Sequence, residues 1–196
     1  LRELVARKLQ ADNGIGAEAE EILITPGAKN ALFLACAALL RPGDEVINLT
    51  PCYVSNGPIL KLSEPQVVVH EVPLIPPEFA LDQDRVRALV SDRTKLLFIN
   101  YPNNPTGRML TEKEAEFIRE LACRQSLRVL SDEIYERLAL TDRQPISSAS
   151  FPELRDRVIT VNGFSKTYAM TGWRIGYLHA PKEIHATALR IHQHLN

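Results

Sequence analysis

One lysine, Lys166, stands where its chemistry could be used. It follows residues 158–161, an apolar stretch that predicts a buried strand, and small residues such as Gly163 and Ser165 lie beside it. A lysine amine that loses its proton, through burial or a neighbouring cation, can form a Schiff base with a carbonyl. Arg174, eight positions on, carries a planar permanent cation that suits a phosphate. The pair indicates a phosphorylated aldehyde, whereas Lys166 alone would be read as a solvated loop lysine.

The run from Gly163 to Gly176 resembles, position by position, the pyridoxal-phosphate attachment signature of class I and II aminotransferases with the aspartate aminotransferase fold. The resemblance implies that Lys166 carries pyridoxal 5'-phosphate and that Arg174 grips its phosphate. One position departs from the pattern, because many relatives have a serine three residues before the lysine and this chain has Gly163. The backbone amide there, or Ser165, would then contact the phosphate.

A carboxylate is expected at the end of a second strand. Residues 127–130 predict a strand, and Asp132 follows them at the carboxyl end, where open α/β sheets gather ligands. A carboxylate there keeps the ring nitrogen of pyridoxal protonated, so that the ring stays an electron sink. The resemblance implies that Tyr135 donates to the phenolic oxygen of the cofactor. The alternative for Asp132 is the N-cap of a short helix over 133–140.

A turn of prolines, asparagines and a glycine, residues 101–107, follows the strand predicted over 95–100. By composition alone it is a plain loop. The resemblance implies that Asn104 hydrogen-bonds the phenolic oxygen of the cofactor together with Tyr135. It also implies a cis peptide bond between Asn104 and Pro105, which a tight turn accommodates.

An anion site is predicted where the strand near 22–24 turns through Gly27 into an apolar helix, because a helix N-terminus offers free backbone donors. The pattern alone is common. The resemblance places phosphate contacts at Gly27, Ala28 and Lys29, and it suggests that Lys29 reaches the distal carboxylate of an acidic substrate. Tyr53, which follows the strand predicted over 45–49, would stack on the pyridine ring. Core packing or a surface position is the alternative for Tyr53.

The composition is typical of a soluble α/β enzyme. The 196 residues are 45% hydrophobic with a net charge of −1, and interspersed charges disfavour nucleic acid. The apolar helix over 31–40 is too short to cross a membrane, and the charged N-terminus does not resemble a secretory signal, so we expect a cytoplasmic protein. Cys36, Cys52 and Cys123 have no metal spacing; we expect reduced, structural cysteines and no metal site.

Alternating strand-like and helix-like segments predict a three-layer α-β-α sandwich around a mostly parallel, mixed sheet. We assign residues 1–181 to a pyridoxal-phosphate-binding large domain without its N-terminal arm, and 182–196 to the start of a helix leading to a missing small domain. The chain begins and stops inside helices, so we expect a central fragment that lacks the substrate-binding arginine. The remaining expected strands are 66–72, 128–130 and 174–179, and the expected helices are 1–11, 82–90, 111–126 and 182–195.

The resemblance implies an aminotransferase acting on amino-acid and 2-oxo-acid substrates, with an acidic amino acid suggested by Lys29. The amine of Lys166, once displaced by the substrate, would move a proton between the substrate Cα and the cofactor. The family forms homodimers with active sites at the interface. The alternatives are a carbon-sulfur lyase or cyclising enzyme with the same fold, and a non-catalytic regulatory module that binds pyridoxal phosphate.

Overall fold

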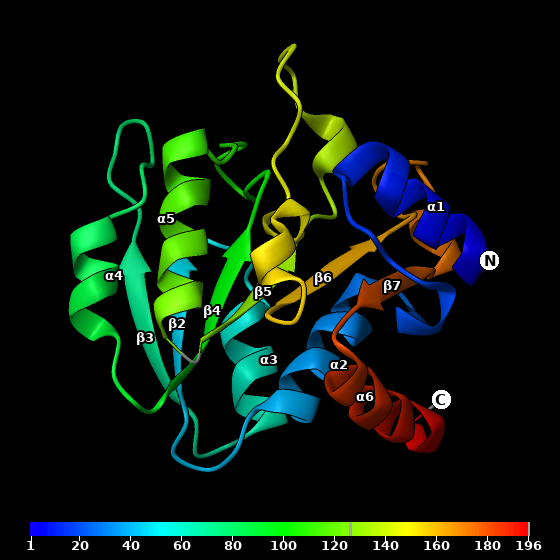
Figure 1. Ribbon diagram of the computed structural model, residues 1–196, viewed down its shortest axis with the longest axis horizontal. Helices are drawn as coiled ribbons and strands as arrows, with labels where there is room; N and C mark the ends of the chain where they lie inside the picture. Colours follow the sequence, from blue (N-terminus) through cyan, green and yellow to red (C-terminus); the bar gives the residue numbers. More distant parts are fainter. Residues whose placement is uncertain (126, 196) are drawn as a thin grey trace.

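Seven strands form one sheet in the computed structural model, which describes residues 1–125 and 127–195 (Figure 1). Their order across the sheet is β1-β7-β6-β5-β4-β2-β3. The strand β7 runs antiparallel to both of its neighbours, and the other pairs are parallel, which confirms a mostly parallel, mixed sheet. The strands are β1 (Ile22–Thr25), β2 (Glu45–Thr50), β3 (Val68–Pro73), β4 (Thr94–Asn100), β5 (Arg128–Asp132), β6 (Val158–Gly163) and β7 (Gly176–His179).

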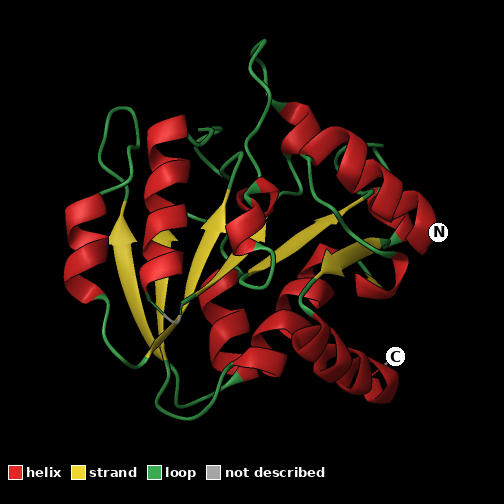
Figure 2. Cartoon of the chain, viewed as in Figure 1, coloured by secondary structure: helices red, strands yellow, loops and turns green. Residues whose placement is uncertain are grey.

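Helices cover both faces of the sheet, so the three-layer arrangement is confirmed (Figure 2). Side chains alternate between two buried clusters, with Val158 in one and Ile159 in the other, because successive residues of a strand face opposite sides. One face packs against α2 (Ala28–Leu39), α3 (Asn56–Ser63) and α6 (Lys182–Leu195), and the other against α1 (Arg2–Asn13), α4 (Gln83–Leu89) and α5 (Glu112–Arg124).

Two rows of residues mark the edge of the sheet where the parallel strands end. Asn100 at the end of β4 stands in register with Asp132 at the end of β5. Gly176 at the start of β7 pairs with Thr25 on one side and with Gly163 on the other. The topology therefore brings segments that are far apart in sequence to one edge, where α/β sheets bind ligands.

The helix α3 was not expected from the sequence, because Gly57 and Pro58 are typical of a turn. In the structure Pro58 lies in the first turn of α3, where a missing N–H leaves no helical hydrogen bond unmade. The strand predicted from Arg174 begins only at Gly176, since Arg174 has a left-handed backbone with φ of 55° and ends a 3₁₀ turn.

The other helices largely match their predictions. The capping box of α5 is confirmed, with the Thr111 side chain accepting from the Glu114 N–H and the Glu114 carboxylate accepting from the Thr111 N–H. Of the predicted end of this helix, Arg124 is its last residue and Ser126 lies outside the described residues. In place of a helix over 133–140 there is a single 3₁₀ turn, Glu136–Leu138.

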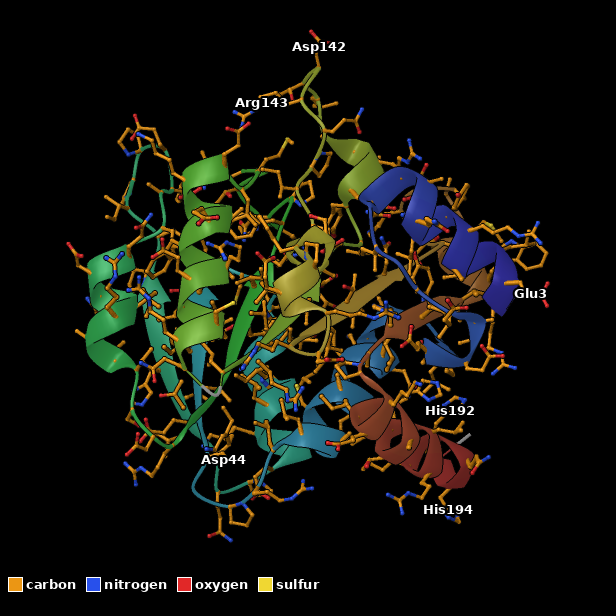
Figure 3. The ribbon with its side chains drawn as sticks, in the orientation of Figure 1. Glu3, Asp44, Asp142, Arg143, His192 and His194 are labelled. Atoms are coloured by element: carbon orange, nitrogen blue, oxygen red, sulfur yellow. The ribbon has the colours of Figure 1, made fainter. Side chains whose placement is uncertain are left out.

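A loop over residues 139–146 projects beyond the body of the molecule, with Asp142 and Arg143 pointing outward at its tip (Figure 3). All three cysteines are free: Cys36 is buried, Cys52 is half-buried and Cys123 is exposed. Among the described helices none is long and apolar enough to cross a membrane.

Candidate active site

A cavity of about 300 Å³ opens at the carboxyl edge of the sheet. This volume suits a small molecule, since such sites span roughly 300–1,000 Å³. The sequence singled out most of its lining, but Leu32, Ile134 and Thr171 were not foreseen. Gly27 and Asn104 do not line the cavity and act on residues that do. The predicted residues that line it are Ala28, Lys29, Tyr53, Asp132, Tyr135, Ser165, Lys166 and Arg174.

One end of the cavity combines a helix N-terminus with a guanidinium group. Gly27 is the N-cap of α2 with φ of 82°, and no described side chain caps this helix. A Cβ at Gly27 would lie 2.3 Å from Nη2 of Arg174, so the absent side chain leaves room for the arginine beside the first turn. A Cβ at Gly176 would lie 2.4 Å from the nitrogen of Ala28. These close approaches set free backbone donors beside a permanent cation, which is an anion site.

The departure at Gly163 has a packing reason. A Cβ there would lie 2.9 Å from the carbonyl oxygen of Ile175 and 3.0 Å from Cα of Gly176. Both neighbours are backbone atoms of the adjacent segment, so a serine at this position would push β7 away from β6. Ser165 is half-buried and lines the cavity instead.

Lys166 lies in the turn that follows β6, three residues beyond its end. Its Nζ is 5.5 Å from the centre of the Tyr135 ring, and the side chain is exposed. Burial within the described chain therefore does not desolvate this amine, contrary to one of the two routes considered from the sequence. The position leaves the amine free to reach a ligand in the cavity.

Asp132 is the buried carboxylate of the site, with 4% of its surface exposed. The one hydrogen bond that this carboxylate accepts within the described residues comes from the Ile134 N–H at 3.2 Å. Burial raises the pKa of Asp132 to about 7, against this hydrogen bond, which lowers it. The bond spans two residues within a turn, so Asp132 does not cap an α-helix. A cation in the cavity would favour the ionised form of this carboxylate. A protonated ring nitrogen would be such a cation.

Tyr135 and Asn104 meet across the site. Nδ2 of Asn104 donates to the Tyr135 hydroxyl at 3.1 Å, although 31 residues separate them. The predicted cis bond between Asn104 and Pro105 is confirmed. The sequence did not reveal how this turn is held: Asn103 donates to the Pro51 carbonyl at 3.2 Å, and Asn100 accepts from the Asn104 N–H at 2.9 Å. Asn103 belongs to the turn motif and Asn100 ends the strand before it, and only the fold identifies their partners.

Tyr53 is half-buried at the opposite wall, and Nζ of Lys29 lies 5.5 Å from the centre of its ring. The Ser55 hydroxyl is the main cause that lowers the pKa of Tyr53, and Lys29 adds to it against the effect of burial. The alternative of a Tyr53 packed in the core does not hold, because the side chain is only half-buried. Its ring is available to a planar ligand.

The turn after Tyr135 is clamped to the first helix. Lys8 pairs with the Glu136 carboxylate, and Asn13 donates to the same group at 2.6 Å. Arg137 pairs with Asp12 at 2.5 Å. Three side chains of α1 thus hold the turn that follows Tyr135.

The model of the family described as aminotransferase class I and II matches residues 1–196. The aspartate aminotransferase of Musicola paradisiaca strain Ech703 is 39% identical over 196 residues, covering 99% of this chain and 48% of the relative. The methionine aminotransferase of Escherichia coli K12 is 37% identical, covering 100% and 50%. The solved structure of an aromatic aminotransferase from Pyrococcus horikoshii OT3 superposes with a TM-score of 0.94 at 40% identity, covering 99% of this chain and 52% of that chain.

The fold of this chain is that of the aminotransferases, and the cavity lies at the carboxyl edge of its sheet. The chain belongs to the class I and II aminotransferase family. Enzymes of this family depend on pyridoxal phosphate. The chain spans about half the length of the curated relatives it matches.

Proposed function

We propose that this chain forms the cofactor-binding part of an aminotransferase that moves an amino group between an amino acid and a 2-oxo acid. The observation that carries the proposal is the joint lining of one cavity by Lys166, Asp132, Tyr135 and Arg174. An amine, a buried carboxylate, a phenol and a guanidinium are the four kinds of group that pyridoxal phosphate requires around it.

The residues present fit the cofactor at each of its polar ends. Arg174 and the free amides of Ala28 and Lys29 would hold the phosphate, with Gly27 leaving the space between them. Asp132 has no cationic partner among the described residues, and burial raises its pKa. A protonated ring nitrogen beside it would lower that pKa again.

The remaining roles follow from the contacts in the cavity. Tyr135 and Asn104, already joined at 3.1 Å, would both donate to the phenolic oxygen, and the Tyr53 ring would cover the face of the pyridine. When bound, pyridoxal phosphate supplies an aldehyde carbon that takes up amino groups and a ring that withdraws electrons from Cα. The amine of Lys166 holds the cofactor and, once displaced by substrate, carries the proton to and from Cα.

We propose an acidic amino acid as substrate, because Lys29 lines the cavity with an exposed side chain. Replacing Lys29 by alanine would then raise KM for aspartate more than KM for an aromatic amino acid. Equal changes for both would contradict the assignment. The matched relatives carry the names of aspartate, methionine and aromatic aminotransferases, so the comparison must include all three substrate types.

We also propose the organisation inferred from the sequence: a pyridoxal-phosphate-binding large domain over 1–181, and a helix over 182–196 that leads towards a small domain. A homodimer and a cytoplasmic location belong to the same proposal. Analytical ultracentrifugation tests the dimer, and cell fractionation tests the location.

The first experiment is to add pyridoxal phosphate to the purified chain, record the absorbance spectrum, reduce with borohydride and map the modified peptide. We expect a single label on Lys166, none in Lys166→Ala, and an unchanged label in Lys182→Ala, which alters an exposed lysine at the start of α6. A label scattered over surface lysines would overturn the proposal.

The same variant separates the alternative activities. In the full-length protein, a Lys166→Ala variant that loses turnover would identify an enzyme, and one that loses only cofactor binding would identify a regulatory module. Release of a 2-oxo acid with no amino acceptor present would identify a lyase. An aminotransferase requires the acceptor for every turnover after the first.

A further inference from the structure

Asn100, the last residue of β4, has a buried side chain whose two polar atoms are both used, and 3% of its surface is exposed. Its Nδ2 donates to the carbonyl oxygen of Asp132 at 2.9 Å. Its Oδ1 accepts from the backbone N–H of Asn104, also at 2.9 Å. One amide therefore joins the ends of two strands that are separated by a whole helix in the sequence.

The two residues that Asn100 joins are proposed to contact different atoms of the cofactor. Asp132 is assigned to the ring nitrogen, and Asn104 to the phenolic oxygen, together with Tyr135. The backbone N–H of Tyr101 also donates to the Asp132 carbonyl, at 3.2 Å, so that carbonyl is held by two donors from the same segment. The Asn100 amide and the Tyr101 N–H thus fix the distance between the backbones of Asp132 and Asn104.

We propose that Asn100 is a positioning residue that fixes the distance between Asp132 and Asn104, and thereby holds Asn104 where it stabilises negative charge on the phenolic oxygen of the cofactor. This inference rests on the proposed function. Asn100 itself touches neither cofactor nor substrate and acts through Asn104 and Asp132.

The side-chain amide of Asn100 meets both requirements at once, because its Nδ2 donates to a carbonyl and its Oδ1 accepts from an N–H. Aspartate at position 100 would keep an acceptor for the Asn104 N–H but would set its second oxygen against the Asp132 carbonyl. Leucine would fill a similar volume and leave the Asn104 N–H without this acceptor. Leucine therefore removes both hydrogen bonds of the bridge, and aspartate removes only the one to the Asp132 carbonyl.

Thr94 provides a matched control, since it is the first residue of β4, at the opposite end of the strand. It is also buried, and its hydroxyl accepts from the Ser91 N–H at 2.9 Å. Thr94→Val removes buried hydrogen bonds from the same strand without touching the cavity. This variant shows how a loss of stability alone affects the titration of the bound cofactor.

The experiment titrates, against pH, the absorbance of pyridoxal phosphate attached to Lys166 in each variant. A less stabilised phenolic oxygen holds the neighbouring proton of the lysine nitrogen more tightly. We therefore expect Asn100→Leu to move the midpoint up by about one pH unit, the effect of a lost hydrogen bond to a charged oxygen. Thr94→Val should lower the melting temperature and leave the midpoint at its wild-type value.

A double variant tests whether the effect passes through Asn104. If Asn104→Ala has already raised the midpoint, adding Asn100→Leu should move it no further. Independent, additive shifts would overturn the inference, and so would a wild-type midpoint in Asn100→Leu. Where Asn100→Leu fails to fold, the isosteric Asn100→Asp takes its place in the double variant. A raised midpoint that gains nothing over Asn104→Ala alone supports the positioning role, and no shift, or a shift that adds to that of Asn104→Ala, overturns it.

The labelling experiment keeps the two proposals apart. If wild-type protein is not labelled at Lys166, the proposed function fails and this inference fails with it. If Lys166 is labelled and the Asn100 variants titrate like the wild type, only the positioning role is wrong.

Discussion

Two buried carboxylates at opposite edges of the same sheet have opposite electrostatic surroundings. Glu45, at the start of β2, accepts from the Ser91 hydroxyl at 2.8 Å and pairs with Arg93 at 2.6 Å. The Ser91 hydroxyl, with help from Arg93, lowers the pKa of Glu45, although burial opposes them. Asp132, at the end of β5, has one backbone donor, and its pKa rises to about 7.

The difference separates a buried carboxylate with several donors from one with a single donor. A buried charge is costly unless it is paired, so a chain that buries Glu45 surrounds it with donors. Asp132 is equally buried and is left short of partners beside a cavity. Such a group makes the folded chain less stable and is compensated only when a cation binds next to it.

The largest expected effect is on the pH dependence of stability without cofactor. The pKa of Asp132 is raised on folding, so its contribution is fully present below its ordinary value near 3.8 and is lost as pH rises to about 7. The upper bound is on the order of 4 kcal/mol. Asp132→Asn should remove this decline, measured as the difference between urea unfolding curves of the two proteins from pH 4 to 7. A constant difference across that range would contradict it.

Glu133 contributes in the same direction and provides a check. Burial raises its pKa to about 7, against the hydroxyls of Ser147 and Ser131, so part of the decline remains in Asp132→Asn. Pyridoxal phosphate should abolish the Asp132 part alone, because in the proposed arrangement the ring nitrogen would pair with that carboxylate and not with Glu133.

The next largest effect is on catalysis. Asp132→Asn should slow amino-group transfer by roughly 10²–10³-fold, the usual loss when one preorganised electrostatic partner is removed. Stopped-flow absorbance after mixing the loaded protein with an amino acid measures this rate. A wild-type rate in the variant would show that Asp132 does not hold the ring nitrogen.

Glu45→Gln should have the opposite profile. It weakens the pairing with Arg93 and the bond from Ser91, at a cost of about 1–3 kcal/mol in unfolding free energy. Since the pKa of Glu45 is lowered, its contribution is present above the ordinary carboxyl pKa and is lost as pH falls through the folded value. Calorimetry at pH 7 and pH 3 should therefore differ less for the variant. Its affinity for pyridoxal phosphate should not change.

The smallest expected effect is on stability, at a third carboxylate, Glu114, which like Glu45 is surrounded by donors. Burial alone would raise the pKa of Glu114, but donors that include Arg108, Leu81 and Thr111 lower it. Thr111→Ala removes the side chain that caps α5 and should cost about 1 kcal/mol. Chemical denaturation measures the loss, and Thr111→Ser, which keeps the hydroxyl, should restore most of it.

The parts of the site that could be predicted are those encoded in local sequence. Lys166, Arg174 and Asp132 were identified because a signature or the end of an apolar stretch marks each of them. The strands themselves were found because their residues are continuously apolar, as buried parallel strands are. Turn chemistry and the capping box at Thr111 and Glu114 are equally local.

The parts that could not be predicted depend on partners far away in the sequence. Nothing near Asn100 indicates that its amide ends on the Asp132 carbonyl, 32 residues away. The low exposure of Asp132 and the high exposure of Lys166 both depend on what packs around them. The helix α3 was missed for a different reason, because a proline in the first turn of a helix has the same sequence signal as a proline in a loop.

Three glycines, Gly27, Gly163 and Gly176, line the junction between α2, β6 and β7, and each has another group within 3 Å of where a Cβ would be. The geometry of this site therefore depends on three positions that have no side chain. An alanine scan normally subtracts atoms and finds residues whose groups do work. At these positions an alanine adds a methyl group that clashes with neighbouring atoms. The scan would therefore record a loss of stability at a junction whose proposed role is to bind an anion.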